Sequence, residues 1–427
     1  GELSMDEALQ QRIRELEARQ AAIQTELAML YQQTGQDRLP PLDGVRIVDL
    51  SWAVFGPLST QILADMGAEV IKVERVDGGD VGRQTHSAYF TNRNKQSLAT
   101  NLRTPEGREM VLKLAETAHI FVHSFRPGVV ERLGVDYAAV SQRNPQIVYC
   151  SLSGFGQDGP YRTRMAADLI IQGMSGMINL MGHADGPPTS VGFLACDITG
   201  ALYNAVAMLL GLRVQQQRGI GQHIELALLD SAMAVQSFPI TWYLNHPDEP
   251  PQPAGRGHWR QIPLYGVFDT KDRPLTMMAG IVEKRWPYLT AIPGMEPLAG
   301  DARFATHVSR QEHAEALNAA CQAILLRRTR DEWLDLLREA GVLCGPVYTY
   351  DELFADPQFQ HNSMVCDLHD LDGSPLKMLR PPIRLSKTPG QVRTPMPSLG
   401  QHTETILQGL GYAADVIERL RQQGIVV

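Results

Sequence analysis

The chain opens with a regular helical pattern of apolar residues. No proline occurs between residues 5 and 35, and apolar side chains return there at alternating spacings of four and three. This series consists of Leu9, Ile13, Leu16, Ile23, Leu27 and Leu30, with the polar Gln20 at one of its positions. Such a heptad seam is typical of a helix that pairs with another helix. The pattern predicts an amphipathic helix over residues 5–35, packed either on a second helix or on its own domain.

After Asp43 the period changes, and short apolar runs alternate with helical stretches. Buried strands are predicted at residues 45–50, 69–74, 119–123, 147–152 and 222–228. A helix is expected from Pro57 to Met66, because proline favours the first turn and Gly67 follows the last. Alternating strands and helices predict an α/β fold whose large domain is a Rossmann-like parallel sheet. The first strand-to-helix turn lacks the GxGxxG pattern, which disfavours an ordinary dinucleotide site.

The second half of the chain adds a smaller α/β domain. Helices are predicted over residues 195–216, a hairpin over 264–279 and further helices up to residue 340. A proline-rich tract at 375–397 is expected to run in extended form back to the first domain, before two closing helices. We therefore divide the chain into a helix (5–35), a large domain (42–220), a small domain (221–340) and a return to the large domain (341–427).

Composition narrows the class of protein. The chain has 427 residues, more than one core usually supports, with 44% hydrophobic and 20% charged residues. A net charge of −8 argues against nucleic acid as a partner. The five cysteines are widely spaced and contain no CxxC pair, and the histidines have no ligand spacing, so no metal site or disulfide framework is expected. Since no run approaches about 18 apolar residues, we expect a cytoplasmic protein that does not span a membrane.

One carboxylate stands at a suggestive place. A Gly/Pro-rich turn at residues 154–161 leads into an apolar helical pattern, and Asp168 lies where that helix should begin. The simplest interpretation is a helix N-cap. Alternatively, helix N–H groups keep Asp168 ionised and aim it into a cleft as a nucleophile. The residues alone leave both interpretations open.

Short motifs recur in order from residue 42 to the end of the chain. They are Leu42–Leu50, Gly56-Pro57, Leu63–Glu74, Asn92–Ser97, Phe125–Gly128, Ser153–Gly156, Cys344–Val347 and Leu399–Thr403. In these motifs the chain resembles the class III CoA-transferases, the family of formyl-CoA transferase and carnitine CoA-transferase. Any one of these motifs is weak evidence for the family, but the whole series in this order is specific to it.

The resemblance implies a function and a site. Asp168 matches the family's nucleophile, which transfers CoA reversibly from an acyl-CoA thioester to a free carboxylic acid through an aspartyl anhydride and an aspartyl-CoA thioester. Coenzyme A and acyl-CoA are then substrates, and no tightly bound cofactor is implied. Arg75, Lys95 and Arg126 lie in matching positions and are implied to bind CoA. Family members form interlocked homodimers with the active site between the domains.

Two alternative functions stay open. One is that of a racemase from the same superfamily, and the other is that of a subunit in a heteromeric transferase. In α-methylacyl-CoA racemases a histidine precedes the matching aspartate and a second aspartate follows later. Here these positions hold Ala167, which cannot accept a proton, and Asp197. The other alternative is a subunit of a heteromeric transferase, for which the helix at 5–35 would be an association device.

The acyl group is harder to assign. Val54 stands where formyl-CoA transferase has a glutamine, and a glycine run of that enzyme is missing after His258, so the formyl/oxalate pair is not expected. Arg256, His258 and Arg260 form a cationic loop, which the family places near the acyl pocket. If it lines that pocket, dicarboxylic acids should be preferred; otherwise the loop is merely solvated.

Overall fold

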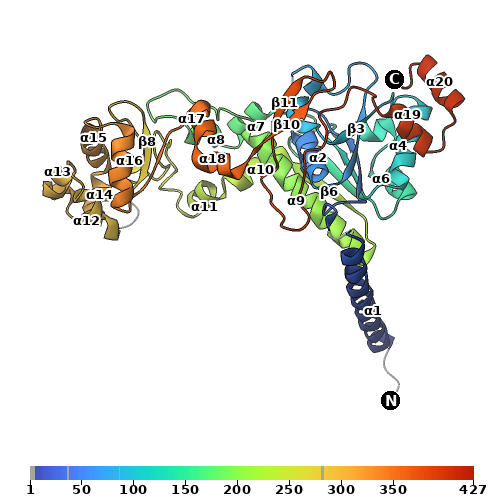
Figure 1. Cartoon of the computed structure of the whole chain (residues 1–427), viewed down its shortest axis with the longest axis horizontal. Helices are drawn as coiled ribbons and strands as arrows, with labels where there is room; N and C mark the ends of the chain where they lie inside the picture. Colours follow the sequence, from blue (N-terminus) through green and yellow to red (C-terminus); the bar gives the residue numbers. More distant parts are fainter. Residues whose placement is uncertain (1–4, 36–37, 86, 280–282) are drawn as a thin grey trace. The chain divides into compact units, whose positions relative to one another are not determined.

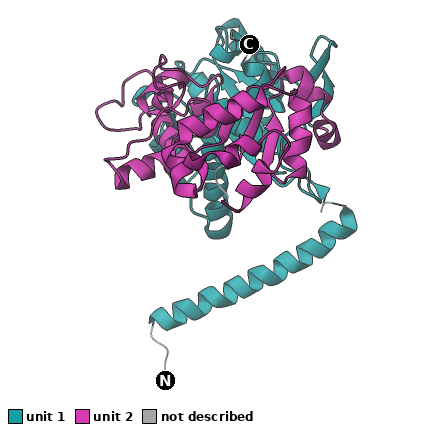
Figure 2. Cartoon of the chain, turned by 90° about the vertical axis from the view of Figure 1, so that its left-hand side faces the viewer, with its two compact units in different colours: residues 1–152, 201–225, 364–427 teal, residues 153–200, 226–363 magenta. Residues whose placement is uncertain are grey.

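The computed structural model describes residues 5–35, 38–85, 87–279 and 283–427. The chain forms two compact units, described separately below (Figure 2). Unit 1 contains residues 1–152, 201–225 and 364–427, and unit 2 contains residues 153–200 and 226–363. This division differs from the predicted one in that the segment with Asp168 belongs to unit 2, and unit 2 extends beyond residue 340.

Unit 1 is built on a six-stranded sheet in the order β3-β2-β1-β4-β5-β6. The strands are β1 (Arg46–Leu50), β2 (Glu69–Glu74), β3 (Lys95–Ala99), β4 (Ile120–His123), β5 (Val148–Ser153) and β6 (Gln222–Ala227). Neighbours from β3 to β5 pair in parallel. This is the strand order of a Rossmann sheet, in which the order of the strands reverses between β1 and β4. The predicted fold class is confirmed, and β3 is a strand that the sequence analysis did not predict.

Helices cover this sheet from widely separated parts of the chain (Figure 1). They are α2 (Phe55–Asp65), α3 (Ala88–Thr91), α4 (Pro105–Glu116), α5 (Val129–Leu133), α6 (Tyr137–Arg143), α9 (Ala195–Arg218), α19 (Thr403–Gly409) and α20 (Ala414–Gln422), with a 3₁₀ turn at Val81–Arg83. The core of the sheet includes Phe121 and Tyr149, and Leu407, Ile417 and Val426 from the end of the chain join it. The C-terminal segment thus completes the domain that the N-terminal half begins, as predicted.

The proline-rich return includes an unpredicted hairpin. Strands β10 (Val365–His369) and β11 (Pro375–Leu379) pair antiparallel, and the segment that follows has no regular structure up to residue 397. Asn94 holds this segment, because its Oδ1 accepts the backbone N–H groups of Arg393 (2.6 Å) and Thr394 (3.0 Å).

Unit 2 combines helices with a small antiparallel sheet. Its strands are β7 (Tyr265–Phe268), β8 (Leu275–Met278) and β9 (Leu343–Pro346), in that order. Its helices are α7 (Asp168–Met174), α8 (Met177–Leu180), α10 (Leu228–Val235), α11 (Ser237–Asn245), α12 (Trp286–Thr290), α13 (Glu296–Gly300), α14 (His307–Glu312), α15 (Ala314–Leu325), α16 (Arg330–Glu339), α17 (Tyr350–Ala355) and α18 (Pro357–Asn362), with 3₁₀ turns at Glu283–Arg285 and Ala302–Phe304. The predicted hairpin is β7–β8. The boundary lies after residue 340 because β9 pairs with β8.

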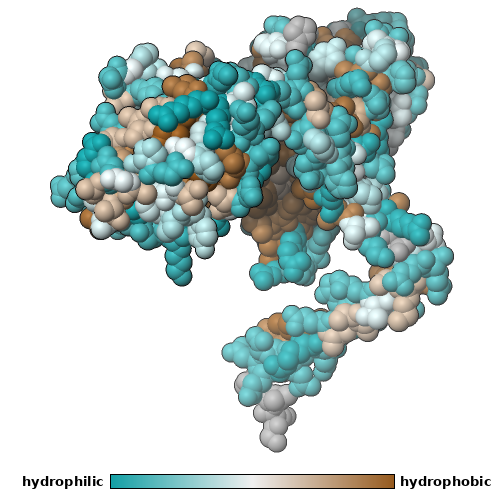
Figure 3. All heavy atoms as spheres, turned by 60° about the vertical axis from the view of Figure 1, so that its left-hand side comes forward, coloured by the Kyte–Doolittle hydropathy of each residue, from teal (hydrophilic) through white to brown (hydrophobic). Residues whose placement is uncertain are grey.

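The N-terminal helix α1 (Met5–Thr34) is one continuous helix of 30 residues. Each of its residues is exposed, so it does not pack on its own domain in this structure. Figure 3 shows its hydrophobic side chains on the surface among hydrophilic ones. Within the described residues, α9 alone is long and apolar enough to cross a membrane, but half of its apolar window is buried, as in core helices of soluble proteins.

Candidate active site

Asp168 does not cap its own helix. It is the first residue of α7, whose N-cap position is held by Ala167 without any side-chain cap. The approach to this helix requires a glycine after β5, because a Cβ at Gly154 would lie 2.2 Å from the Cβ of Ala166. The N-cap interpretation therefore does not hold.

The carboxylate of Asp168 instead meets the first turn of another helix. Its Oδ1 accepts the backbone N–H groups of Cys196 at 2.8 Å and Asp197 at 3.0 Å, where α9 begins. These N–H groups have no partner within their own helix and carry its positive dipole end, so they favour a negative charge on Asp168. Asp168 is buried, with 6% of its surface exposed.

Gln172 holds the other oxygen of the carboxylate. One turn further along α7, its Nε2 donates to Asp168 Oδ2 at 2.5 Å. Its Oε1 accepts the backbone N–H of Val191 at 3.0 Å, which orients the amide. The sequence analysis missed Gln172, although its spacing of four residues from Asp168 placed both side chains on one helix face.

Two titratable groups adjoin Asp168. Burial, followed by the charge of Asp168, raises the pKa of Asp197 to about 7. The same two causes raise the pKa of Cys196 to about 12, so its thiol stays protonated at neutral pH. Cys196 is therefore a poor competing nucleophile, because the thiolate is the reactive form.

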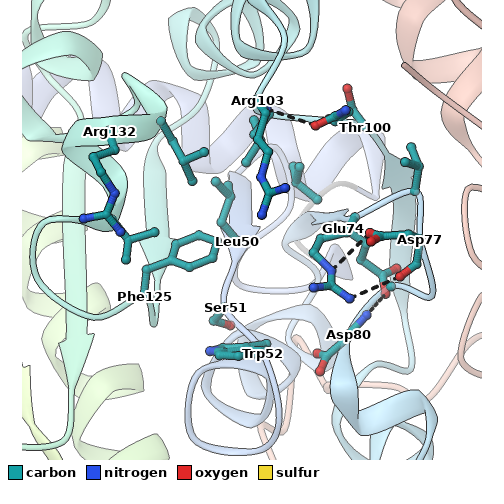
Figure 4. Close-up of a pocket in the computed structure, with 18 of the residues that line it drawn as sticks. Leu50, Ser51, Trp52, Glu74, Asp77, Asp80, Thr100, Arg103, Phe125 and Arg132 are labelled. Carbon is teal, nitrogen blue, oxygen red and sulfur yellow. Dashed lines mark hydrogen bonds and ion pairs between the residues drawn. The ribbon is translucent and has the colours of Figure 1, made fainter. Parts of the chain in front are cut away.

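Unit 1 contains a separate cavity of about 590 Å³. It is lined by residues that follow β1, β2, β3 and β4, at the carboxyl ends of the strands, where open α/β sheets bind ligands. Leu50, Trp52, Phe125 and other apolar side chains form its body, and Figure 4 shows Phe125 pointing into it. Its volume suits a small-molecule ligand.

Four arginines line the same cavity. Arg75 and Arg126, both predicted from the sequence, are joined by Arg103 and Arg132, which the sequence analysis missed. All four are exposed. Arg75 pairs with Asp77 at 3.3 Å, and among the described residues no ion pair engages the other three. Such guanidinium groups suit phosphate oxygens.

The other acids of this cavity are already paired within unit 1. Glu74 accepts two hydrogen bonds from Arg83, at 2.7 and 2.8 Å. Asp80 forms a buried ion pair with Lys72 at 2.9 Å, and its other oxygen accepts the N–H of Ala53 at 2.8 Å. These pairs leave the cavity with a positive charge from its arginines.

Lys95 differs from the prediction that it contacts CoA. Its ammonium is fully buried beneath the sheet edge and bonds to Asp49 Oδ2 at 3.0 Å, Asn92 Oδ1 at 2.9 Å and the carbonyl of Pro57 at 2.8 Å. Burial lowers the pKa of Lys95 to about 8 although Asp49 opposes the shift. With all three of its donors used inside the protein, Lys95 does not line the cavity.

The predicted acyl-pocket residues lie in different places. Val54 is buried in unit 1 beside the start of α2 and does not line the cavity there. His258 lines a second cavity of about 330 Å³ in unit 2. Arg260 lies over the ring of Trp242, 4.2 Å from its centroid. His258 and Arg260 thus belong to unit 2, and Val54 belongs to unit 1.

Arg256 contributes less positive charge to the second cavity than the sequence of the loop suggested. Its guanidinium forms two hydrogen bonds with Asp269, at 2.6 and 2.7 Å. Burial and the nearby Arg260 lower the pKa of His258, so this imidazole is mainly neutral at pH 7.

In the described part of the chain, no group of three metal-ligating side chains is present.

Comparison with known proteins places this geometry in a family. The model of CoA-transferase family III matches residues 42–403. Succinate–glutarate CoA-transferase of Agrobacterium fabrum is 35% identical over 398 residues, covering 90% of this chain and 98% of the relative. The beta subunit of succinyl-CoA–L-malate CoA-transferase of Chloroflexus aurantiacus is 29% identical, covering 90% and 98%.

A solved structure agrees. A CAIB/BAIF family protein from Brucella suis superposes with a TM-score of 0.78 at 34% identity, covering 87% of this chain and all of the other. The racemase alternative is not favoured by these relatives. The chain belongs to CoA-transferase family III and is a CoA-transferase.

Proposed function

We propose that this enzyme exchanges CoA between two dicarboxylic acids, with Asp168 as the covalent nucleophile. The observation that carries the mechanism is the unequal environment of its two oxygens. Oδ1 faces two backbone N–H groups, and Oδ2 faces a single side-chain amide. A carboxylate oxygen has two lone pairs, so Oδ2 keeps one for attack while Gln172 holds the other.

The first half of the reaction releases the donor acid. Asp168 Oδ2 attacks the thioester carbonyl of the donor, and the C–S bond breaks to give a mixed anhydride and CoA thiolate. The thiolate then attacks the Asp168 carbonyl carbon of the anhydride, and the bond between this carbon and Oδ2 breaks, so that Oδ2 leaves as part of the donor carboxylate. The products are an aspartyl-CoA thioester and the donor carboxylate, and no proton is gained or lost.

The second half repeats these steps with the acceptor. Its carboxylate attacks the aspartyl thioester and expels CoA thiolate, which gives a new anhydride. The thiolate attacks the acceptor carbonyl, releasing the new acyl-CoA and restoring the Asp168 carboxylate. Thioester and anhydride are close enough in energy for this exchange to be reversible without another energy source.

The start of α9 supplies the electrostatic assistance. When Asp168 is acylated or thioesterified, Oδ1 becomes the carbonyl oxygen, and attack on this carbon places a negative charge on it. The N–H groups of Cys196 and Asp197 already point at Oδ1, so this charge develops in a preorganised oxyanion hole. Removing one such donor in other enzymes costs about 10²–10³ in rate.

The cavity in unit 1 suits the nucleotide end of CoA. Its apolar body offers surface to the adenine, and Arg75, Arg103, Arg126 and Arg132 offer charge to the phosphates. The second cavity, with His258, remains our proposal for the acyl group. Arg260 is the nearby cation that we propose for a distal carboxylate. The relatives named above act on succinate with glutarate and on succinyl-CoA with malate, which supports dicarboxylic substrates.

The proposal also includes the oligomeric state of the enzyme. A homodimer is supported by an exposed apolar face of α9, and the heteromeric alternative by the relative that is a beta subunit. A cytoplasmic location stays a prediction from the cysteine pattern.

A substrate panel tests the reaction. Purified protein is incubated with one acyl-CoA and one free acid at a time, and the CoA products are separated by mass. Dicarboxylic pairs should exchange CoA faster than pairs that include an unbranched monocarboxylic acid. Equal rates for both classes would contradict the substrate assignment and leave the transfer reaction intact.

A variant tests the nucleophile. Asp168→Ala should fold normally and lose at least about 10³-fold in rate, the scale of losing a covalent nucleophile. Hydroxylamine should trap Asp168 as a modified residue in the unaltered enzyme with acyl-CoA alone. Near-normal transfer by Asp168→Ala would contradict the covalent mechanism for every substrate pair.

A further inference from the structure

The apolar seam of α1 packs on none of the residues that the structure describes. Leu9, Ile13, Leu16, Ile23, Leu27 and Leu30 are 59%, 41%, 49%, 49%, 38% and 47% exposed. Six aliphatic side chains in one stripe on a helix of about 45 Å leave much apolar surface in water. Most helices in proteins owe their stability to packing of such a stripe. α1 also precedes the residues matched by the family, so the shared fold does not account for it.

The spacing assigns every position of the seam to a heptad. The a positions are Asp6 in the first turn, Ile13, Gln20, Leu27 and Thr34 at the end of the helix, and the d positions are Leu9, Leu16, Ile23 and Leu30. A seam of this kind fits a copy of itself, because a and d residues pack into equivalent holes of the facing helix. The first candidate partner is therefore α1 of a second chain.

Gln20 decides the direction of pairing. In a parallel pair it lies opposite Gln20 of the partner subunit, where two amides can hydrogen-bond to each other. In an antiparallel pair an a position faces a d position, so Gln20 would meet Leu16 or Ile23, which offer no hydrogen bond. A buried amide without a partner costs about 1–3 kcal/mol.

Charges agree with the parallel direction. In parallel coiled coils the g position of one heptad faces the e position of the next heptad on the other helix. Arg12 occupies a g position and Glu17 the following e position, so the pair forms twice by symmetry. The other such combinations are Met5 with Gln10, Arg19 with Gln24 and Glu26 with Tyr31, and none brings like charges together.

We propose that α1 forms a parallel two-stranded coiled coil with α1 of a second copy of this chain. This contact is independent of the transfer chemistry. It joins two enzyme molecules through a segment outside the matched family region. The helix is thus an assembly device rather than part of the active site.

Cysteine cross-linking of the full-length enzyme tests this proposal. Leu16→Cys places a thiol at a d position, which faces its symmetry mate only in the parallel pair, and Ala18→Cys places one on the opposite side of the same helix. The native cysteines are buried, apart from the half-buried Cys344, and interfere little. On mild oxidation, Leu16→Cys should form covalent dimers several times faster than Ala18→Cys. Equal rates, or no dimer with Leu16→Cys, would overturn the proposal.

Two further variants check the result. Ile23→Cys, at the next d position, should behave as Leu16→Cys, which guards against local disruption at Leu16. Glu17→Lys in the Leu16→Cys background places lysine against Arg12 and should slow cross-linking. Adding Arg12→Glu should restore it, and a failure to do so would contradict the parallel register. Transfer activity should be unchanged in all these variants, so it reports separately on the proposed reaction.

Discussion

Gln172 is the side chain that fixes the direction of Asp168. It is 2% exposed and bonds both to the carboxylate and to the backbone of Val191, so it couples the nucleophile to the loop before α9. We expect Gln172→Ala to lower kcat by roughly 10²-fold, the scale of a small misplacement, and to leave KM for acyl-CoA nearly unchanged. Steady-state kinetics measures both constants.

A buried glutamine elsewhere in unit 2 provides the matched control. Gln236 is 7% exposed and donates to the carbonyls of Ser175 and Ala232, without contact to Asp168. Gln236→Ala should lower the melting temperature to a similar extent and leave kcat almost intact. If both variants lose kcat equally, Gln172 has only a structural role.

Asp197 gives the protein a dependence on pH near neutrality. Because burial and the Asp168 charge raise its pKa to about 7 in the folded state, the protonated form favours folding at low pH. This stabilisation is lost as the pH rises through about 7. Asp197→Asn stays neutral, so its melting temperature should exceed that of the unaltered enzyme by a margin that grows from about pH 4 to about pH 7 and then levels off.

At the scale of single residues, prediction succeeded where a local motif marks one side chain. It failed where contacts with residues distant in sequence determine whether a side chain is buried. Asp168 stood out because a Gly/Pro turn and a helical pattern met at one carboxylate, although its partners belong to a helix that starts 27 residues later. The burial of Lys95 could not be read from its motif. It depends on Asp49 from another strand, a pairing that no local pattern reveals.

At the scale of elements, β3 was not predicted because it contains buried charged and polar residues. The strand begins with Lys-Gln-Ser, which looks like a surface turn, yet it lies beside β2 as part of the sheet. The polar residues are tolerated there because they are paired, as Ser97 is with Glu74 at 2.7 Å. Strands that follow the apolar pattern, such as β1 and β2, were predicted to within a residue.

The ion pair of Lys95 should be essential to this part of unit 1. Lys95→Met removes the ammonium that pairs with the buried Asp49 at 3.0 Å, and breaking a buried pair costs about 3–5 kcal/mol. Chemical denaturation should show the loss. Lys377→Met removes an exposed pair with Asp367 and should cost less than about 1 kcal/mol. A rise in KM for every acyl-CoA at unchanged stability would instead restore Lys95 to the CoA site.

At the scale of the whole molecule, the sequence predicted the two-part architecture but not where the parts divide. The proline-rich tract at 375–397 indicated that the chain end returns to the first domain, and Leu407 and Val426 lie in the core of that domain. The division itself depends on pairings distant in sequence, such as β8 with β9, which spans more than 60 residues. The hydrophobic pattern along the chain predicts which residues are buried, but it does not predict which element packs over them.

The long helix α9 combines burial and exposure in a way that a monomer does not explain. Ala201, Ala205, Met208 and Leu212 on one face are buried, while Leu202, Val206, Leu209 and Leu210 on another are exposed by 43% or more. Exposed aliphatic residues at this spacing form a contiguous apolar stripe, typical of an interface. We propose that a homodimer forms through this face.

Leu210→Glu tests the dimer. Leu210 is 61% exposed, so a glutamate there should be harmless to a monomer and costly in an apolar interface, where its charge would be desolvated. Because α1 is also proposed to pair, the test is made in protein whose α1 seam carries Leu16→Glu and Ile23→Glu. In that background we expect light scattering after size exclusion to show a lower mass with Leu210→Glu than without it. Arg218→Glu, in the last turn of α9, also changes the charge of an exposed residue but lies on a different face of the helix, so it should leave the mass unchanged. If Leu210→Glu leaves the mass unchanged as well, the stripe serves a different partner, as in a heteromeric transferase.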